Sequence, residues 1–258
     1  MNTLTRPVGA KVILSAGACM ALAGCGATVA STSGGGVPAA TAPGHAASVS
    51  AGSGAGSGGG SAASGASIPF PAAVGDTWVY KLSFALGSGS MATDKVVANV
   101  PVAGGRQVTM VQTSEGLTTR LIFVFHPDGS ITYPVADVGG QTTSSGGILW
   151  PPASVIASRQ PVRQQVTMHT GAGSQTDLVQ TTVQGAGTAT VTVPAGTYQA
   201  TIVNVTMTVP LGGGSITVVE VRTWFAADVG PVKSETLITR GGNTTATARS
   251  ELTSFIKV

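Results

Sequence analysis

The feature that most constrains this chain is the alternation of apolar and polar side chains from about residue 76 to the C-terminus. Val203, Val205 and Met207, for example, are separated by polar residues. Successive side chains of a β-strand point to opposite faces of a sheet, so this period indicates strands with one buried face. The same segments are rich in Thr and Val, whose branched side chains favour strands.

Short runs of turn-forming residues separate the alternating segments. In chain order they are Gly87-Ser88-Gly89, Gly104-Gly105, Pro127-Asp128-Gly129, Pro194-Ala195-Gly196, Gly212-Gly213-Gly214 and Gly241-Gly242-Asn243. Their spacing predicts about ten to thirteen antiparallel strands. Because an open twisted sheet of that size curls, the expected fold class is all-β, a curved antiparallel sheet closing into a barrel or half-barrel.

One stretch, residues 136–157, interrupts the alternation. It contains Gly139-Gly140 and the segment Ile148-Leu149-Trp150-Pro151-Pro152. We expect a long loop here that folds over the sheet. Trp150 then either plugs an end of the sheet or packs locally.

The N-terminal residues 1–24 have the layout of a bacterial export signal. Arg6 and Lys11 precede an apolar run over residues 12–23. That run is too short to span a bilayer, which needs roughly 20 residues, but it fits the core of a signal peptide. We therefore expect the protein to be exported and residues 1–24 to be removed.

The apolar run ends in Leu22-Ala23-Gly24-Cys25, which resembles the lipobox of bacterial lipoproteins. The resemblance implies attachment of diacylglycerol to the Cys25 sulfur and cleavage before that residue. Such an anchor would hold the protein on the outer face of the cytoplasmic membrane, since each buried methylene contributes about 0.8 kcal/mol. The alternative is an ordinary secretory signal cleaved after Ala21-Leu22-Ala23, with Cys25 as an unmodified thiol.

Residues 25–67 form the predicted tether, in which Gly, Ala, Ser, Thr and Pro predominate. This segment cannot bury enough apolar surface to offset its conformational entropy, so we expect it to be disordered. A coil of about 40 such residues has a root-mean-square span of roughly 35 Å. The tether would therefore hold the predicted β-domain, residues 68–258, clear of the membrane.

The charge distribution argues against a nucleic-acid partner. The net charge is +3, but Arg6 and Lys11 lie in the signal segment, and the remaining eleven basic residues face ten acidic ones. The basic residues are scattered singly and form no run, so no phosphate-binding surface is expected. The sequence implies no cofactor.

Three segments together resemble a known group of proteins. They read VGDTWVY at residues 74–80, VPAGTY at residues 193–198 and WFAADVGPVK at residues 224–233. In that order they resemble exported bacterial proteins of the TapB-like group of domains of unknown function. The resemblance implies a curved antiparallel sheet or barrel, and it implies no catalytic residues. Each segment also has a structural explanation as a turn at the end of a strand.

A set of aromatic residues is the candidate ligand site. Its members, which could line a cavity for an apolar ligand, are Trp78, Tyr80, Phe84, Trp224 and Phe225. Alternation places Trp224 and Phe225 on opposite faces, so at most one of those two can line a cavity. The alternative is that these aromatic residues are simply part of the core.

The sequence contains one cluster that could carry polar chemistry. His126 and Asp128, together with His169, could supply metal ligands, but Asp128-Gly129 is also typical of a hairpin turn. We expect a turn and no metal site. No nucleophile elbow or nucleotide-binding loop is recognisable, so no catalytic residue is predicted.

The function expected from the sequence is that of a lipid-anchored extracytoplasmic protein with a non-enzymatic β-domain for binding or interaction. Its partners would be the membrane, through Cys25, and an envelope protein, a cell-wall polymer or a lipid. The first alternative is a carrier or sensor of a hydrophobic ligand such as a lipid held in the curved sheet. A hydrolase is the more remote alternative.

Overall fold

A computed structural model of the chain describes residues 70–85, 87–138, 141–169, 176–210 and 216–258. The predicted signal segment 1–24 and tether 25–67, including Cys25, lie outside the described residues. The division of the chain into these two segments and a β-domain therefore stays a prediction.

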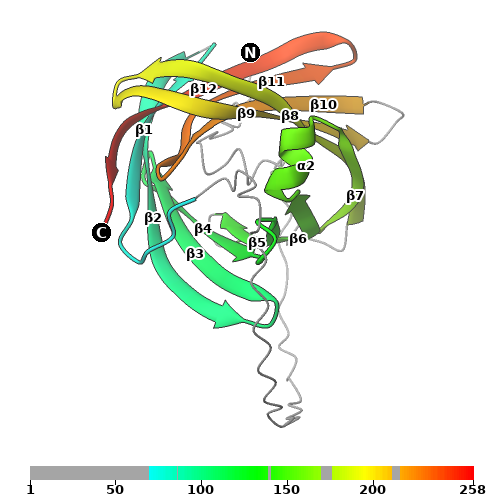
Figure 1. The fold of residues 1–258 in the computed structure, drawn as a ribbon. Helices are drawn as coiled ribbons and strands as arrows, with labels where there is room; N and C mark the ends of the chain where they lie inside the picture. Colours follow the sequence, from blue (N-terminus) through cyan, green and yellow to red (C-terminus); the bar gives the residue numbers. More distant parts are fainter. Residues whose placement is uncertain (1–69, 86, 139–140, 170–175, 211–215) are drawn as a thin grey trace, which may run out of the picture.

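The described residues form twelve strands and one short helix (Figure 1). The strands are β1 (Thr77–Phe84), β2 (Gly87–Val102), β3 (Gly105–Ser114), β4 (Leu117–Phe125), β5 (Ile131–Val138), β6 (Gln141–Trp150), β7 (Val162–His169), β8 (Thr176–Val193), β9 (Gly196–Pro210), β10 (Ile216–Ala226), β11 (Gly230–Arg240) and β12 (Asn243–Ile256). The helix is α2 (Ala153–Ser158). Nowhere in the described residues does a helix combine the length and the apolar character needed to cross a membrane.

The strands form a closed antiparallel barrel in which each strand pairs with its neighbours in sequence and β12 pairs back with β1. This arrangement confirms the predicted fold class and strand number. Closure of the ring pairs most strands along both of their edges. The weakest contact in the ring is between β6 and β7, where only Ser144 pairs with His169 and Ser145 with Met168.

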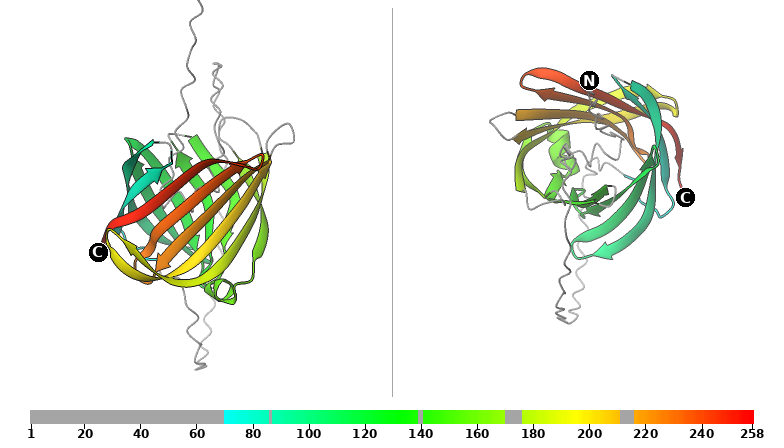
Figure 2. Two further views of the ribbon diagram at one scale, coloured as in Figure 1. Left: turned by 90° about the horizontal axis from the view of Figure 1, so that it is seen from above. Right: turned by 180° about the vertical axis from the view of Figure 1, so that it is seen from behind.

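The two ends of the barrel differ. We call one the plugged end. It holds the segment 70–76, helix α2, the 226–230 turn and the C-terminus, and Figure 2 shows α2 and the C-terminus at this same end. The opposite end, where β1 ends at Phe84, is called the far end.

Burial along the strands follows the predicted alternation. In β1, the side chains of Trp78, Tyr80 and Leu82 are buried, whereas Lys81 between them is exposed. The inner wall is therefore built from every second residue, and it carries most of the hydrophobic core. The largest buried aromatic side chains lie toward the plugged end.

The prediction of a long loop over residues 136–157 is wrong. Strand β5 continues to Val138, β6 covers Gln141–Trp150, and α2 follows directly after two prolines. Gly and Ser have low strand propensity, but the hydrogen-bonded ladder with β5 overrides it. The backbone of Trp150 pairs with Ile131, and its side chain lies outside what the structure describes.

Candidate functional site

The plugged end is filled by a cluster of aromatic rings. Trp78 stacks on Phe255 with ring centroids 5.1 Å apart, and Phe70 lies 5.3 Å from Trp78. Phe125 connects the cluster to β4, because its ring lies 5.7 Å from Phe70 and 6.5 Å from Phe123. Rings at these separations contribute both buried area and favourable ring–ring contacts. This end of the barrel is therefore closed by its own side chains.

The polar atoms of Trp78 and Tyr80 are both satisfied by backbone. Trp78 Nε1 donates to the carbonyl of Val229 at 2.6 Å, and the Tyr80 hydroxyl donates to the carbonyl of Pro231 at 2.9 Å. The two side chains are 0% and 1% exposed. The structure thus holds these two predicted ligand-contact residues in the core, and they fasten β1 to the turn before β11.

The segments that carry the sequence resemblance also meet at the plugged end. Trp78 and Tyr80 belong to the first segment, and their acceptors Val229 and Pro231 belong to the third. The second segment joins them through Ala195, whose N–H donates to Leu252 of β12 at 3.0 Å. These contacts favour the explanation that the three segments maintain the architecture.

Asp76 completes this end of the barrel. One carboxylate oxygen accepts the N–H of Ala73 at 2.9 Å, and the other accepts the N–H of Val258 at 3.0 Å. Asp76 is 1% exposed, and both hydrogen bonds are partly buried. The carboxylate therefore ties the entry of the domain to its last residue.

The remaining aromatic candidates lie apart from one another. Phe225 is buried in the core, whereas Trp224 contacts the outward-facing Lys233 and Arg222. The two residues therefore occupy opposite faces of β10, as alternation predicted. Phe84 is partly buried against the core near the far end. The structure does not gather the five predicted aromatic residues into one site, and the ligand-binding role assigned to them stays a prediction.

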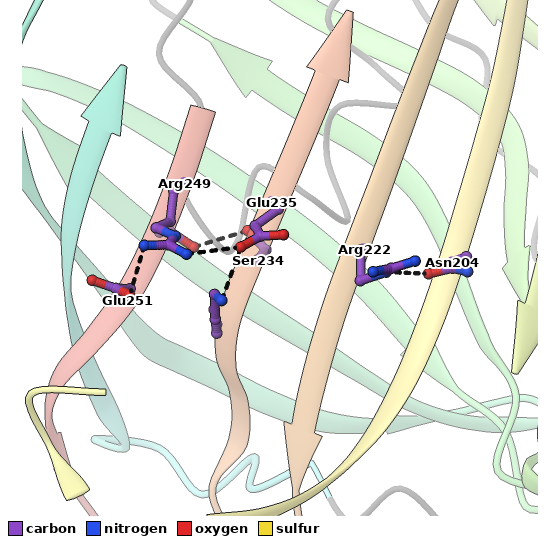
Figure 3. Close-up of polar contacts among 8 residues, drawn as sticks. Asn204, Arg222, Ser234, Glu235, Arg249 and Glu251 are labelled. Carbon is purple, nitrogen blue, oxygen red and sulfur yellow. Dashed lines mark hydrogen bonds and ion pairs between the residues drawn. The ribbon is translucent and has the colours of Figure 1, made fainter. Parts of the chain in front are cut away.

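An ordered set of charged side chains crosses the outer face of β11 and β12 (Figure 3). Glu235 accepts from Lys233 at 2.8 Å and from Arg249 at 3.0 Å, and Arg249 also lies 3.5 Å from Glu251. Partial burial raises the pKa of Glu235, but the bonds and charges of Lys233 and Arg249 outweigh it and leave that pKa below 4.5. Because the set is partly exposed, it contributes little to stability.

On the neighbouring strands β10 and β9, Arg222 Nε donates to Asn204 Oδ1 at 3.1 Å (Figure 3). The ammonium of Lys233 lies 4.5 Å from the centre of the Trp224 ring. Positive groups over an indole face are attracted by the electron density of the ring. Together these contacts cover Trp224 from solvent, although it faces outward.

His126 and Asp128 are engaged within their own hairpin. Asp128 Oδ1 accepts the N–H of Ser130 at 2.9 Å and its hydroxyl at 2.6 Å, and these bonds lower the pKa of Asp128. His126 Nδ1 donates to the carbonyl of Gly104 at 3.0 Å, and Nε2 lies 2.6 Å from Thr132 Oγ1. These bonds confirm the predicted turn.

The metal-ligand alternative is not supported by the topology. His126 follows β4 at the plugged end, whereas His169 is the last residue of β7 at the far end. Among the described residues, no three His, Cys, Asp or Glu side chains are arranged to hold a metal.

The inner wall also carries hydroxyl groups that the sequence analysis missed. We call them the hydroxyl band: Ser90, Thr181, Thr223, Ser234, Thr236 and Ser250. Within it, Ser234 Oγ and Ser250 Oγ lie 2.9 Å apart in a buried hydrogen bond. These residues stand at the alternate positions of their strands whose side chains point into the barrel. Their position in the alternation could have identified them from the sequence, because polar residues there interrupt an otherwise apolar face.

One further polar pair lies on the inner wall. Gln112 Nε2 donates to Asp94 Oδ1 at 2.8 Å, and both side chains are buried. Asp94 on β2 pairs directly with Trp78 on β1. This pair therefore lies beside the aromatic cluster.

Comparison with known families gives one partial match. A family model described as DUF3108-like matches residues 156–247, from α2 to the first part of β12. That is less than half of the chain. No curated protein matches the chain.

One solved structure shows the same fold, and two others have lower TM-scores. A protein from Bacteroides fragilis, described as exported and as having a YmcC-like fold, superposes with a TM-score of 0.54 at 14% identity, over 74% of this chain and 100% of its own. A protein from Parabacteroides distasonis described as a lipoprotein has a TM-score of 0.45 at 15% identity, covering 72% and 97%. The hypothetical lipoprotein YmcC of Escherichia coli has a TM-score of 0.40 at 10% identity, covering 74% and 89%.

The family-model match agrees with the broader inference from the sequence that the chain contains a domain of unknown function. The chain shares the YmcC-like fold of the Bacteroides fragilis protein. Assignment to the TapB-like group specifically stays a prediction.

Proposed function

We propose that this chain is an envelope lipoprotein whose β-barrel is held outside the cytosol by a lipidated Cys25 and has a non-enzymatic binding role. The observation that carries the proposal is the sequence Leu22-Ala23-Gly24-Cys25 at the end of an apolar run, followed by a Gly-rich tether. The fold shared with a protein described as exported supports this location.

The geometry of the barrel suits such a tethered domain. The described chain enters at Phe70, which packs at the plugged end. The tether therefore joins the barrel at that end, and the far end points away from the attachment point. A barrel that pairs most of its strand edges also resists edge-to-edge aggregation without needing a disulfide.

The anchor is tested by mass spectrometry of the mature protein and by partition into membranes. The expected mature N-terminus is an acylated Cys25, and Cys25→Ala should abolish both acylation and membrane retention. Cys19→Ala is the matched control, because it changes the other cysteine within the segment that is removed. An unacylated N-terminus at Gly24, or a protein retained in the cytoplasm with Met1 intact, would refute the anchor.

Within this role, the barrel interior favours the binding of a small hydrophobic molecule. An eight-stranded barrel is about wide enough for side chains to fill, and barrel diameter grows with strand number. This ring has twelve strands, and several inward residues are small, among them Ala92, Ala248 and Ser250. We therefore favour a carrier or sensor of a hydrophobic ligand over a purely structural domain.

The carrier role is tested with the full chain purified without detergent exchange. Native mass spectrometry should detect a bound lipid-sized molecule that organic extraction removes. Labelling of the folded protein by a serine-reactive probe would instead favour the hydrolase alternative, which the proposal excludes.

A further inference from the structure

The hydroxyl band follows the hydrogen-bonded register around the wall. Thr223 on β10 pairs with Ser234 on β11, and Ser234 pairs with Ser250 on β12. Ser250 then pairs with Leu82 of β1, and Leu82 pairs with Ser90 of β2. Directly paired residues face the same side of a sheet. Inward-facing hydroxyls therefore recur over a continuous arc of the interior.

On three strands a hydroxyl of the band is the next inward residue beyond an apolar residue of the plugged end. On β10, Thr223 lies farther from that end than Phe225 does. The same order holds on β11 for Ser234 after Val232, and on β12 Ser250 lies beyond Leu252. The interior thus has an apolar section next to the plug, and the hydroxyls that follow it alternate with further apolar residues such as Val221 on β10 and Val179 on β8.

One hydroxyl in the band is buried without a partner. Thr181 is 1% exposed, shares the inward phase of β8 with Val179 and Val183, and its Oγ1 has no hydrogen-bond partner. On β2, six strands away around the ring, the Ser90 Oγ is also buried without a partner. Buried hydroxyls are almost always paired, because an unpaired one has lost its water without compensation. The Thr181 hydroxyl therefore indicates a polar group that completes it, and the Ser90 hydroxyl on the opposite wall needs a second group.

The charge of the inner wall restricts what that group can be. Every described lysine and arginine is exposed except Lys233, which is half-buried on the outer face against Trp224. The described acid beside the aromatic cluster, Asp94, accepts from Gln112. A phosphate or carboxylate would find no described cation inside the barrel to compensate its desolvation. An uncharged group with hydroxyl or ester oxygens fits both the unpaired and the paired hydroxyls.

We propose that the barrel interior binds an uncharged lipid whose polar end carries hydroxyl and ester oxygens, of the acylglycerol class. Its polar end hydrogen-bonds to the hydroxyl band at Thr181, and its acyl chains lie against the apolar section next to the plug. This inference rests on the carrier role proposed above and specifies its ligand.

The test uses the mature full chain with Cys25→Ser, which lacks the acyl attachment site. The probes are dioleoylglycerol and dioleoyl phosphatidic acid, which share their acyl chains and differ in the phosphate. Titration by native mass spectrometry should show dioleoylglycerol binding at least about tenfold more tightly, since no described inner cation compensates the phosphate.

The variant Thr181→Val should weaken dioleoylglycerol binding by about tenfold, because the bond to the lipid is lost. The same change should raise the melting temperature of the lipid-free protein, since it removes an unpaired buried hydroxyl. Thr181→Ser keeps the hydroxyl and should restore binding. Thr188→Val, on an exposed position of the same strand, is the matched control and should change neither quantity.

The outcomes separate the inference from the carrier role. Equal affinity for both probes, or unchanged dioleoylglycerol binding by Thr181→Val, would overturn the inference and leave the carrier role standing. Binding of neither probe would overturn both, while the Cys25 anchor has its own test. Cross-links from residues 26–67 to the inner wall in the lipid-free chain would identify the chain's own tether as the occupant and also overturn the inference.

Discussion

The aromatic plug and the hydroxyl band face the same barrel interior, yet they are built differently. In the plug, large rings contact one another, and the polar atoms of Trp78, Tyr80 and Asp76 are all bonded to backbone. In the band the side chains are small, and the hydroxyls of Thr181 and Ser90 are buried without partners. The comparison teaches that the side chains of the plug stabilise the fold, whereas the hydroxyl band retains groups that can still form hydrogen bonds.

The largest expected effect comes from removing the central ring of the plug. Trp78→Ala should lower the free energy of unfolding by about 3–5 kcal/mol, because it leaves a cavity and an unpaired carbonyl at Val229. Urea denaturation of the mature chain measures this change. Phe84→Ala, at the edge of the core near the far end, should cost clearly less. If Trp78→Ala and Phe84→Ala lowered the free energy of unfolding equally, the plug would contribute no more to stability than the edge of the core does.

The next effect tests the clamp at the same end. Asp76→Ala should lower the free energy of unfolding by about 3 kcal/mol, since the N–H groups of Ala73 and Val258 lose a buried, charged acceptor. Hydrogen exchange should become faster at these two amides before it does elsewhere. Glu220→Ala, which removes an exposed acid from β10, is the control and should be close to neutral. An Asp76 variant as stable as this control would contradict the role assigned to the clamp.

In the hydroxyl band the expected effects on stability are smaller. Ser234→Ala and Ser250→Ala should each cost about 1 kcal/mol, because each removes the buried hydrogen bond between the two hydroxyls. The double variant should cost little more than either single one, because both partners are then absent. A double-mutant cycle with chemical denaturation measures the coupling. If these variants lost as much free energy of unfolding as Trp78→Ala, the hydroxyl band would also be a main source of stability.

The smallest expected effect concerns the outer face. Glu235→Gln should cost under about 1 kcal/mol at neutral pH, because the ion pairs with Lys233 and Arg249 are partly exposed. The pKa of Glu235 is lowered in the folded protein, so its contribution is present above pH 4.5 and is lost as the pH falls through the folded pKa. Stability curves of the two proteins should therefore converge in acid. A difference that grew below pH 4.5 would contradict this account.

The fold could be predicted because its signal is local. Alternation in β1, visible at Trp78, Tyr80 and Leu82, needs only neighbouring residues, and it recurs in strand after strand. The Gly- and Ser-rich strand β6 could not be predicted in this way. Its pairing with β5 comes from the completed barrel, which supplies backbone partners regardless of the low strand propensity of the side chains.

The candidate site was less accessible to prediction because it depends on contacts between distant residues. Alternation correctly separated Trp224 from Phe225, but the bond from Trp78 to Val229 joins residues 151 positions apart. No local pattern indicates such a pair. The hydroxyl band was overlooked for a different reason: Thr and Ser at inward positions look like gaps in an apolar face until neighbouring strands place them side by side.

The most direct test of the account is the content of the barrel in protein taken gently from the bacterial envelope. Native mass spectrometry with lipid extraction should find an uncharged glycerolipid bound to the wild-type chain, and much less of it on Thr181→Val, although the lipid-free variant is the more stable of the two. A wild-type barrel that is consistently free of lipid, or that carries an anionic lipid unaffected by Thr181→Val, would contradict the central claim.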